Sequence, residues 1–200
     1  PDALAKTAQQ FGVSTAGAID ARVGQAEMVL LAVKPQQMRD VAQQLALLLQ
    51  PGQLVISIAA GIRLQDLVRW LGHAAVVRAM PNTPALIGQG MTGLVASKQV
   101  PPAQRESAQV ILQAVGQTLW LENDSQIDAV TAVSGSGPAY VFYFLEAMKQ
   151  AGQELGLSSE QALQLVLQTF AGATQLAQSA TEPLAVLRDR IGEVPDHGAR

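Results

Sequence analysis

The segment Ser134-Gly135-Ser136-Gly137-Pro138 carries the most specific chemical signal of the sequence. Two glycines at alternate positions can expose successive backbone N–H groups, and a long apolar helix is predicted to start directly after them. Such an arrangement suits an anion, which would be either a phosphate group or a substrate carboxylate. A helix capped by Ser134 or Ser136, with Pro138 in its first turn, would explain the same residues without a ligand.

Three further segments with suitable chemistry follow predicted strands. In an open parallel sheet, ligands bind beyond the carboxyl ends of the strands. Lys34 could approach a phosphate there, and the small residues at 59–61 would let a flat cofactor lie against the backbone. Asn82 and Thr83 could form neutral hydrogen bonds. Each segment also has an ordinary explanation, as a solvated strand end or a tight turn. The segments are Val33-Lys34-Pro35, Ala59-Ala60-Gly61 and Met80-Pro81-Asn82-Thr83-Pro84.

The composition excludes several classes of chemistry. The 200 residues contain no cysteine, which excludes disulfides, thiolate nucleophiles and cysteine-rich zinc sites. With only His73 and His197, both expected at the surface, a histidine metal cluster is not expected. A net charge of -3 and a pI near 5.3 argue against nucleic acid as the main partner. Trp70 and Trp120 are expected to pack rather than to stack on a cofactor, and the strand residue Arg78 is expected to have a partner or a ligand.

The hydrophobic pattern predicts alternating strands and helices over residues 1–123, and therefore a sheet that is parallel over most of its width. Continuous apolar runs such as Met28–Val33 are typical of strands that are covered on both faces. The predicted strands span residues 28–33, 54–58, 75–80, 91–96 and 118–121, and the predicted helices span residues 2–11, 36–49, 64–71 and 102–115.

After Asn123 only helices are predicted. The first two are apolar on almost every side, with Tyr140 and Phe144 on one face and Val141 on another. Helices of this kind must be covered on every side, so a second subunit is expected to complete their core. The chain is therefore expected to divide into an α/β domain at residues 1–123 and an all-α dimerisation domain at residues 124–200. The predicted helices span residues 136–155, 159–179 and 182–191.

The uncharged stretch at residues 161–181 is, at roughly 20 residues, long enough to be considered as a membrane span. It contains five glutamines, which hydrocarbon would tolerate poorly, so a buried helix at a subunit interface is the better explanation. No signal peptide is recognised before Asp2, and a soluble, cytoplasmic protein is expected.

Four segments together resemble the pyrroline-5-carboxylate reductases in order and spacing, and the similarity runs from about residue 1 to Asp189. Ser-Gly-Ser-Gly-Pro-Ala-Tyr in this position is highly specific to that family. The resemblance implies a partial Rossmann-type, doubly wound parallel sheet followed by a helical domain that interlocks in homodimers, often assembled into decamers. The segments are Ala32-Val33-Lys34-Pro35, Ile58-Ala59-Ala60-Gly61, Arg78-Ala79-Met80-Pro81-Asn82-Thr83-Pro84 and Ala132-Val133-Ser134-Gly135-Ser136-Gly137-Pro138-Ala139-Tyr140.

The resemblance also implies a reaction, in which NADPH or NADH reduces the cyclic imine 1-pyrroline-5-carboxylate to L-proline in the last step of proline biosynthesis. A protonated imine is already electrophilic, so the protein mainly has to position the nicotinamide and exclude water. Ser134, Gly135, Ser136 and Gly137 should then lie near the nicotinamide and the substrate, with no acid–base residue assigned. The cofactor cleft should be lined by Ala32, Val33, Lys34, Pro35, Ala59, Ala60, Gly61, Asn82 and Thr83.

The sequence departs from the family pattern at both ends. The family begins with a strand and a Gly-rich phosphate loop, followed by a second strand whose end contacts the adenosine ribose, whereas this sequence starts in the following helix. No preference between NAD and NADP is therefore predicted. The family's Ser-Pro-Gly-Gly-Thr-Thr-like substrate loop is replaced after Asp189 by Arg190-Ile191-Gly192. We therefore expect this chain alone to be at least ~100-fold less active than a complete enzyme.

Two other functions are considered. The related β-hydroxyacid dehydrogenases resemble one another in a catalytic lysine about one helical turn after a Gly-rich helix start. Here the first lysine after Gly137 is Lys149, which disfavours alcohol chemistry. A catalytically impaired chain that acts only as an oligomerising module is the other alternative.

Overall fold

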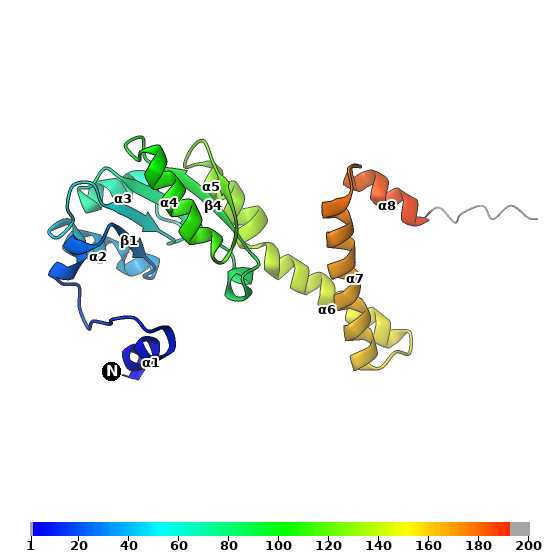
Figure 1. Cartoon of the computed structure of the whole chain (residues 1–200). Coiled ribbons are helices and arrows are strands. Elements are labelled where there is room, and N and C mark those ends of the chain that lie inside the picture. The colour runs from blue at the N-terminus through cyan, green and yellow to red at the C-terminus, as the bar shows by residue number, and fades with distance from the viewer. Residues whose placement is uncertain (1, 193–200) are drawn as a thin grey trace, which may run out of the picture. The chain divides into compact units, whose positions relative to one another are not determined.

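Five short apolar runs form one sheet in the computed structural model, which describes residues 2–192. Strands β1, β2 and β3 are parallel and pair in this order. Strand β4 is antiparallel to β3, because the connection over residues 81–89 is too short for a parallel crossover, and β5 is parallel to β4. The expected sheet, parallel over most of its width, is confirmed. The strands are β1 (Met28–Leu31), β2 (Leu54–Ser57), β3 (Val76–Met80), β4 (Gly90–Ala96) and β5 (Gly116–Trp120) (Figure 1).

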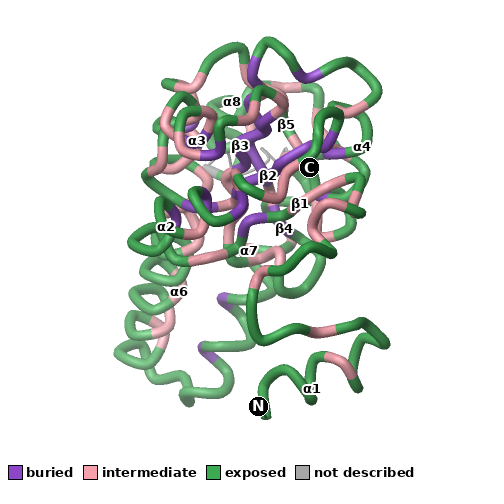
Figure 2. The backbone as a smooth tube through the Cα atoms, turned by 90° about the vertical axis from the view of Figure 1, so that its left-hand side faces the viewer, coloured by how far each residue is buried: buried purple, intermediate pink, exposed green. Residues whose placement is uncertain are grey.

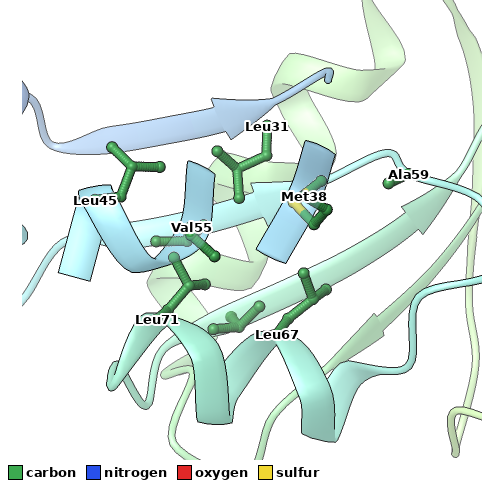
Figure 3. Packing of buried hydrophobic residues seen from close by; sticks show 9 residues of the cluster. Leu31, Met38, Leu45, Val55, Ala59, Leu67 and Leu71 are labelled. Carbon is green, nitrogen blue, oxygen red and sulfur yellow. The ribbon is translucent and has the colours of Figure 1, made fainter. Parts of the chain in front are cut away.

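Helices cover both faces of this sheet, which confirms the doubly wound architecture. Met38 of α2 and Leu67 of α3 pack with Val55 of β2 on one face (Figure 3). Neighbouring strand residues point to opposite faces, so Ile56 packs on the other side, in a second cluster with Ala108 of α4. The helical elements before residue 124 are α1 (Asp2–Phe11), η1 (Ala21–Gln25), α2 (Pro35–Ala46), α3 (Leu64–Leu71), η2 (Thr83–Ile87) and α4 (Pro102–Gln113).

Most helix boundaries follow from local sequence. Helices α1 and α3 have the predicted bounds, and α3 ends at Gly72 in the left-handed conformation, with φ 57. Helix α2 begins at Pro35 but ends at Ala46 instead of the predicted residue 49. The reason is a tight turn, in which the N–H groups of Leu48 and Leu49 both donate to the Leu45 carbonyl.

The chain becomes helical earlier after the sheet than the sequence predicted. Helix α5 (Gln126–Val130) leads directly into a π-helical turn, η3 (Thr131–Gly135), before the long helix α6 (Gly137–Glu154). Ile127 of α5 is fully buried. A Cβ on Gly93 of β4 would lie 2.9 Å from a methyl of Val130, so α5 rests closely on the sheet. Compact packing accordingly extends to Pro138, and the second unit starts at Ala139, later than the boundary expected at residue 124.

The second unit is entirely helical over its described residues. Helix α7 (Ser159–Ser179) starts with a reciprocal cap between Ser158 and Gln161, and α8 spans Leu184–Gly192. Only Ala162 and Val166 of α7 are buried, and Figure 2 shows α6 exposed along most of its length. Within residues 2–192, no helix is both long and apolar enough to span a bilayer.

Candidate functional site

The three predicted ligand-binding segments lie at one edge of the sheet. The register aligns Leu31 with Ser57, and Ser57 with Arg78, so β1 and β2 end level with each other and β3 continues two residues further, to Met80, at the same edge. Strands β4 and β5 run the opposite way, and their first residues therefore lie at this same edge. The topology thus brings together residues 32–35, 58–61 and 81–83, as the sequence predicted.

The segment after β1 is open to solvent at the start of α2. Ala32, Lys34 and Pro35 are exposed, whereas Val33 is half-buried and packs against the core of the first unit. Pro35 is the first residue of α2, and Lys34 caps the helix without a side-chain hydrogen bond. The Lys34 ammonium group and the helix N-terminus together provide positive potential for an anionic group.

The segment after β2 has one buried and two exposed residues. Ala59 is 5% exposed and belongs to the same core cluster as Leu31, so only its backbone can face a ligand. Ala60 and Gly61 are exposed, and nothing lies within 4 Å of a Cβ built on Gly61. Gly61 has φ 76, a conformation that favours glycine. This small, open turn has room for a flat group against the backbone, which fits a dinucleotide.

Asn82 and Thr83, which follow β3, differ in their surroundings. Thr83 is exposed at the start of η2. The half-buried Asn82 uses both ends of its amide within the chain: its Oδ1 accepts the Met91 N–H at 2.9 Å, and its Nδ2 donates to the carbonyl oxygen and Oγ of Ser134, each at 3.2 Å. These bonds connect the turn after β3 to the π-helical turn.

The backbone conformation of the glycine-rich segment differs from the open anion-binding loop that was expected there. The structure places Ser134 and Gly135 inside the π-helical turn, and Ser136 follows in a right-handed helical conformation with φ -86 and ψ -18. The Ser136 N–H donates to the Thr131 carbonyl at 2.8 Å, so it is not available to a ligand. Ser134, Gly135, Ser136 and Gly137 are all half-buried. The Ser136 N–H is therefore not one of the free N–H groups expected in this segment, because the helical path continues through Gly135. π-Helical turns nevertheless occur frequently at functional sites.

An ion pair whose acidic partner the sequence did not predict joins β3 to the segment that precedes α5. The Arg78 guanidinium, with its side chain 3% exposed, lies 2.7 Å from Oδ1 of Asp124. The other carboxylate oxygen of Asp124 accepts the N–H of Leu64, the first residue of α3, at 3.2 Å. Arg78 therefore has a protein partner, one of the two possibilities left open by its position in an apolar strand. The available signal was a charge inside a buried strand, which requires a counter-charge.

An apolar cavity of about 320 Å³ lies next to Ser134. Leu119 and Val133 contribute exposed apolar surface to it, and Val130 and Gly93, which lie close together, also line it. A water-poor wall beside a polar serine suits a ring that carries one charged group. The cavity is lined by Met91, Gly93, Leu119, Ala129, Val130, Val133 and Ser134.

The remaining candidates have structural roles. His73 is partly exposed, and one of its ring nitrogens lies 2.7 Å from the Gln53 carbonyl. Trp120 donates to Gln109 at 2.8 Å and packs on the core, as predicted. His197 lies outside the described residues. Among residues 2–192, no group of three or more His, Cys, Asp or Glu side chains could hold a metal ion.

Family comparisons agree with this arrangement. A family model described as pyrroline-5-carboxylate reductase dimerisation matches residues 124–193, and one described as NADP oxidoreductase coenzyme F420-dependent matches residues 1–61. The pyrroline-5-carboxylate reductase of Pseudomonas aeruginosa is 52% identical over 188 residues, which are 94% of this chain and 69% of that protein. The Haemophilus influenzae enzyme is 44% identical over 168 residues, and the chain spans 62% of its length.

Solved structures give the same result. The pyrroline-5-carboxylate reductase of Coxiella burnetii has a TM-score of 0.89 and 39% identity, over 99% of this chain and 74% of that one. The Plasmodium falciparum enzyme, solved with NADP bound, has a TM-score of 0.80 and 29% identity, over 90% of this chain and 72% of that one. A prephenate dehydrogenase of Aquifex aeolicus, 14% identical with a TM-score of 0.57, shares the fold alone. The sequence similarity, the fold and the length of the match agree, and the chain belongs to the pyrroline-5-carboxylate reductase family.

Proposed function

We propose that this chain forms the cofactor cleft and part of the substrate site of an NAD(P)H-dependent reductase that converts 1-pyrroline-5-carboxylate to L-proline, the last step of proline biosynthesis. One observation carries the proposal most strongly. The strand ends expected to hold the dinucleotide and the Ser134 segment expected to lie near the substrate belong to one hydrogen-bonded unit, joined through Asn82.

The chemistry demands little of the protein beyond positioning. A bound reduced nicotinamide supplies a hydride that adds to the carbon of the protonated C=N bond, and its electrons convert the imine to a ring amine, leaving the nicotinamide oxidised. The apolar wall beside Ser134 would orient the ring and exclude water, and no covalent nucleophile is required. The serine, glycine and apolar residues of the site are compatible with such a reaction.

The proposed cofactor contacts divide by chemistry. Lys34 and the start of α2 would bind a phosphate, while Ala60 and Gly61 would let the dinucleotide approach the backbone. Thr83 adds an exposed hydroxyl group at this edge. The remaining residues of the proposed cleft, with the backbone of Ala59 in place of its side chain, are Ala32, Val33, Pro35 and Ala59. The NADP in the Plasmodium falciparum relative supports NADPH or NADH as the cofactor.

We also propose that the protein forms homodimers, which can assemble further into decamers, and that it is located in the cytoplasm. Tyr140, Phe142, Tyr143 and Phe144 of α6 are each more than half exposed in the single chain. Such a cluster of aromatic side chains is typical of an interface. The dimerisation model that matches residues 124–193 covers this helix.

Turnover by the purified chain tests the reaction. The chain is incubated with 1-pyrroline-5-carboxylate and NADPH or NADH, and the loss of reduced cofactor is compared with the proline formed. Proline formation with one cofactor would support the proposal and establish the preference. In a parallel incubation with a 3-hydroxyacid and NAD⁺ or NADP⁺, oxidation of the hydroxyacid with reduction of the cofactor, together with no imine reduction, would indicate a β-hydroxyacid dehydrogenase instead. A folded, dimeric chain that turns over neither substrate would retain only the oligomerising role.

A charge substitution tests the cofactor cleft separately. Lys34→Gln should weaken NADPH binding about tenfold, equivalent to about 1.4 kcal/mol, because a phosphate loses its cationic partner. Lys98→Gln is the matched control, since Lys98 is also exposed but follows β4 at the opposite edge of the sheet. Equal affinities of the two variants, measured by titration calorimetry, would exclude Lys34 as a phosphate ligand.

A further inference from the structure

Asn82 connects two segments that the sequence places far apart. It lies two residues after β3, and its partner Ser134 lies in the π-helical turn, 52 positions further along the chain. The bond between Asn82 Oδ1 and the Met91 N–H ties the same residue to the beginning of β4. Three hydrogen bonds therefore fix the orientation of one half-buried amide.

The Ser134 carbonyl lacks the usual α-helical donor for a local reason. In a continuous α-helix, this carbonyl would accept a hydrogen bond from the N–H of the residue four positions later. That residue is Pro138, which has no N–H. The Asn82 amide supplies the missing donor at 3.2 Å and binds the Ser134 hydroxyl at the same distance. The helical path can thereby continue through a proline with a satisfied carbonyl.

From this geometry we infer that Asn82 is a positioning residue, which holds Ser134 and the π-helical turn against the sheet edge and does not bind the dinucleotide directly. The assignment rests on the proposed function and revises the cofactor-lining role expected for Asn82. Both polar atoms of its side chain are already occupied within the chain. A ligand that bound the Asn82 side chain would have to displace one of these hydrogen bonds or share the Asn82 amide group with it.

Asn82→Asp isolates this role because it changes one donor and almost no volume. The carboxylate can still accept the Met91 N–H, but it cannot donate to Ser134 and places an anionic oxygen beside the Ser134 carbonyl. Asn123→Asp is the matched control. The Asn123 side chain only accepts hydrogen bonds, from Ser125 and Gln126, and aspartate preserves that function.

Hydrogen–deuterium exchange of the full chain gives the direct readout. Asn82→Asp should accelerate exchange in peptides covering residues 131–136 about tenfold, since losing the anchor favours local opening, while Asn123→Asp leaves exchange there unchanged. Unchanged exchange in Asn82→Asp would overturn the inference. In wild-type protein, the Asn82 side-chain NH₂ protons should show nuclear Overhauser contacts to Ser134; their absence would also overturn it, and this measurement does not depend on the folding of a variant.

Kinetics distinguishes positioning from cofactor binding. In Asn82→Asp, kcat/KM for the imine should fall about tenfold or more, while the NADPH dissociation constant stays within about twofold. Weaker NADPH binding with unchanged exchange at residues 131–136 would make Asn82 a cofactor ligand instead. If wild-type chain does not reduce the imine, the proposed function fails, and the exchange and Overhauser measurements still decide whether Asn82 holds Ser134.

Discussion

At the scale of single residues, Arg78 and Asp124 form the most deeply buried ion pair among the described residues. The remaining ion pairs among the described residues involve side chains that are substantially exposed, such as Arg69 with Asp66 at 70% and 29%. Exposed pairs contribute little to stability, whereas a buried charge that loses its partner is costly. The sequence identified Arg78 as a residue that needs a partner but could not identify Asp124, because the contact depends on the packing of α5 near α3.

Removing the Asp124 carboxylate should therefore lower the stability of the protein substantially. We expect Asp124→Ala to lower the free energy of unfolding by about 3 kcal/mol, since it leaves the Arg78 guanidinium buried without a counter-charge. Asp66→Ala, which breaks the exposed pair with Arg69, should cost less than about 1 kcal/mol. Urea denaturation of both variants provides the comparison, and similar losses would contradict a structural role for the buried pair.

Asp20 offers a test of electrostatics by pH. Side-chain and backbone hydrogen bonds from Arg22 lower the pKa of Asp20 from its ordinary 3.8 to about 2. Because the folded pKa is depressed, the stabilisation is fully present above pH 3.8 and is lost as the pH falls toward 2. A carboxyl ¹³C titration should give this low pKa, and Arg22→Gln should raise it toward the ordinary value. A wild-type pKa near 3.8 would show that Arg22 does not form these bonds in solution.

The elements of the first unit were largely predictable, because each depends on a local pattern. Apolar runs identified all five strands, and periodic apolar residues identified α1, α2, α3 and α4, whereas α5 and the short elements η1 and η2 were not predicted. The π-helical turn was missed because Gly135, Gly137 and Pro138 normally interrupt a helix. Asn82 is hydrogen-bonded to Ser134 of this turn, and a contact across 52 positions has no local signal. The segments around the site were thus predictable, but their hydrogen bonds were not.

The packing of α5 on β4 can be tested with one methyl group. A Cβ at position 93 would lie 2.9 and 3.0 Å from the two methyls of Val130, so Gly93→Ala should destabilise the first unit by about 1–3 kcal/mol. The additional substitution Val130→Ala should recover part of the loss by removing the clashing methyls. Gly17→Ala is the control, since nothing lies within 4 Å of its Cβ. Thermal unfolding that shows no recovery in the double variant would argue against this contact.

At the scale of the whole molecule, the described part of the second unit, residues 139–192, buries little of its apolar surface, with only Ala162 and Val166 of α7 buried. Phe142 and Tyr143 of α6 are 64% and 70% exposed in the single chain. Covering apolar surface of this size with a partner subunit would stabilise the protein. The sequence predicted this need from helices that are apolar on nearly every side, although the pattern alone does not specify the number of subunits.

We expect light scattering after size-exclusion chromatography to give twice the 21.0 kDa chain mass. Phe142→Glu should shift the protein toward the monomer, because a charge would be buried in the interface. Leu47→Glu is the control, since Leu47 is 86% exposed in the turn after α2, outside the helical unit. A wild-type monomer at micromolar concentration would contradict the proposed dimer.

Hydride transfer to the imine is the central claim, and isotopic labelling tests it most directly. The purified chain is incubated with 1-pyrroline-5-carboxylate and NADPH that carries deuterium at the transferable position of the nicotinamide, and the proline is analysed by mass spectrometry. We predict L-proline with one deuterium, on the ring carbon that was doubly bonded to nitrogen. Unlabelled proline, or no proline from a folded and dimeric chain, would contradict the proposal that this chain reduces the imine by hydride transfer.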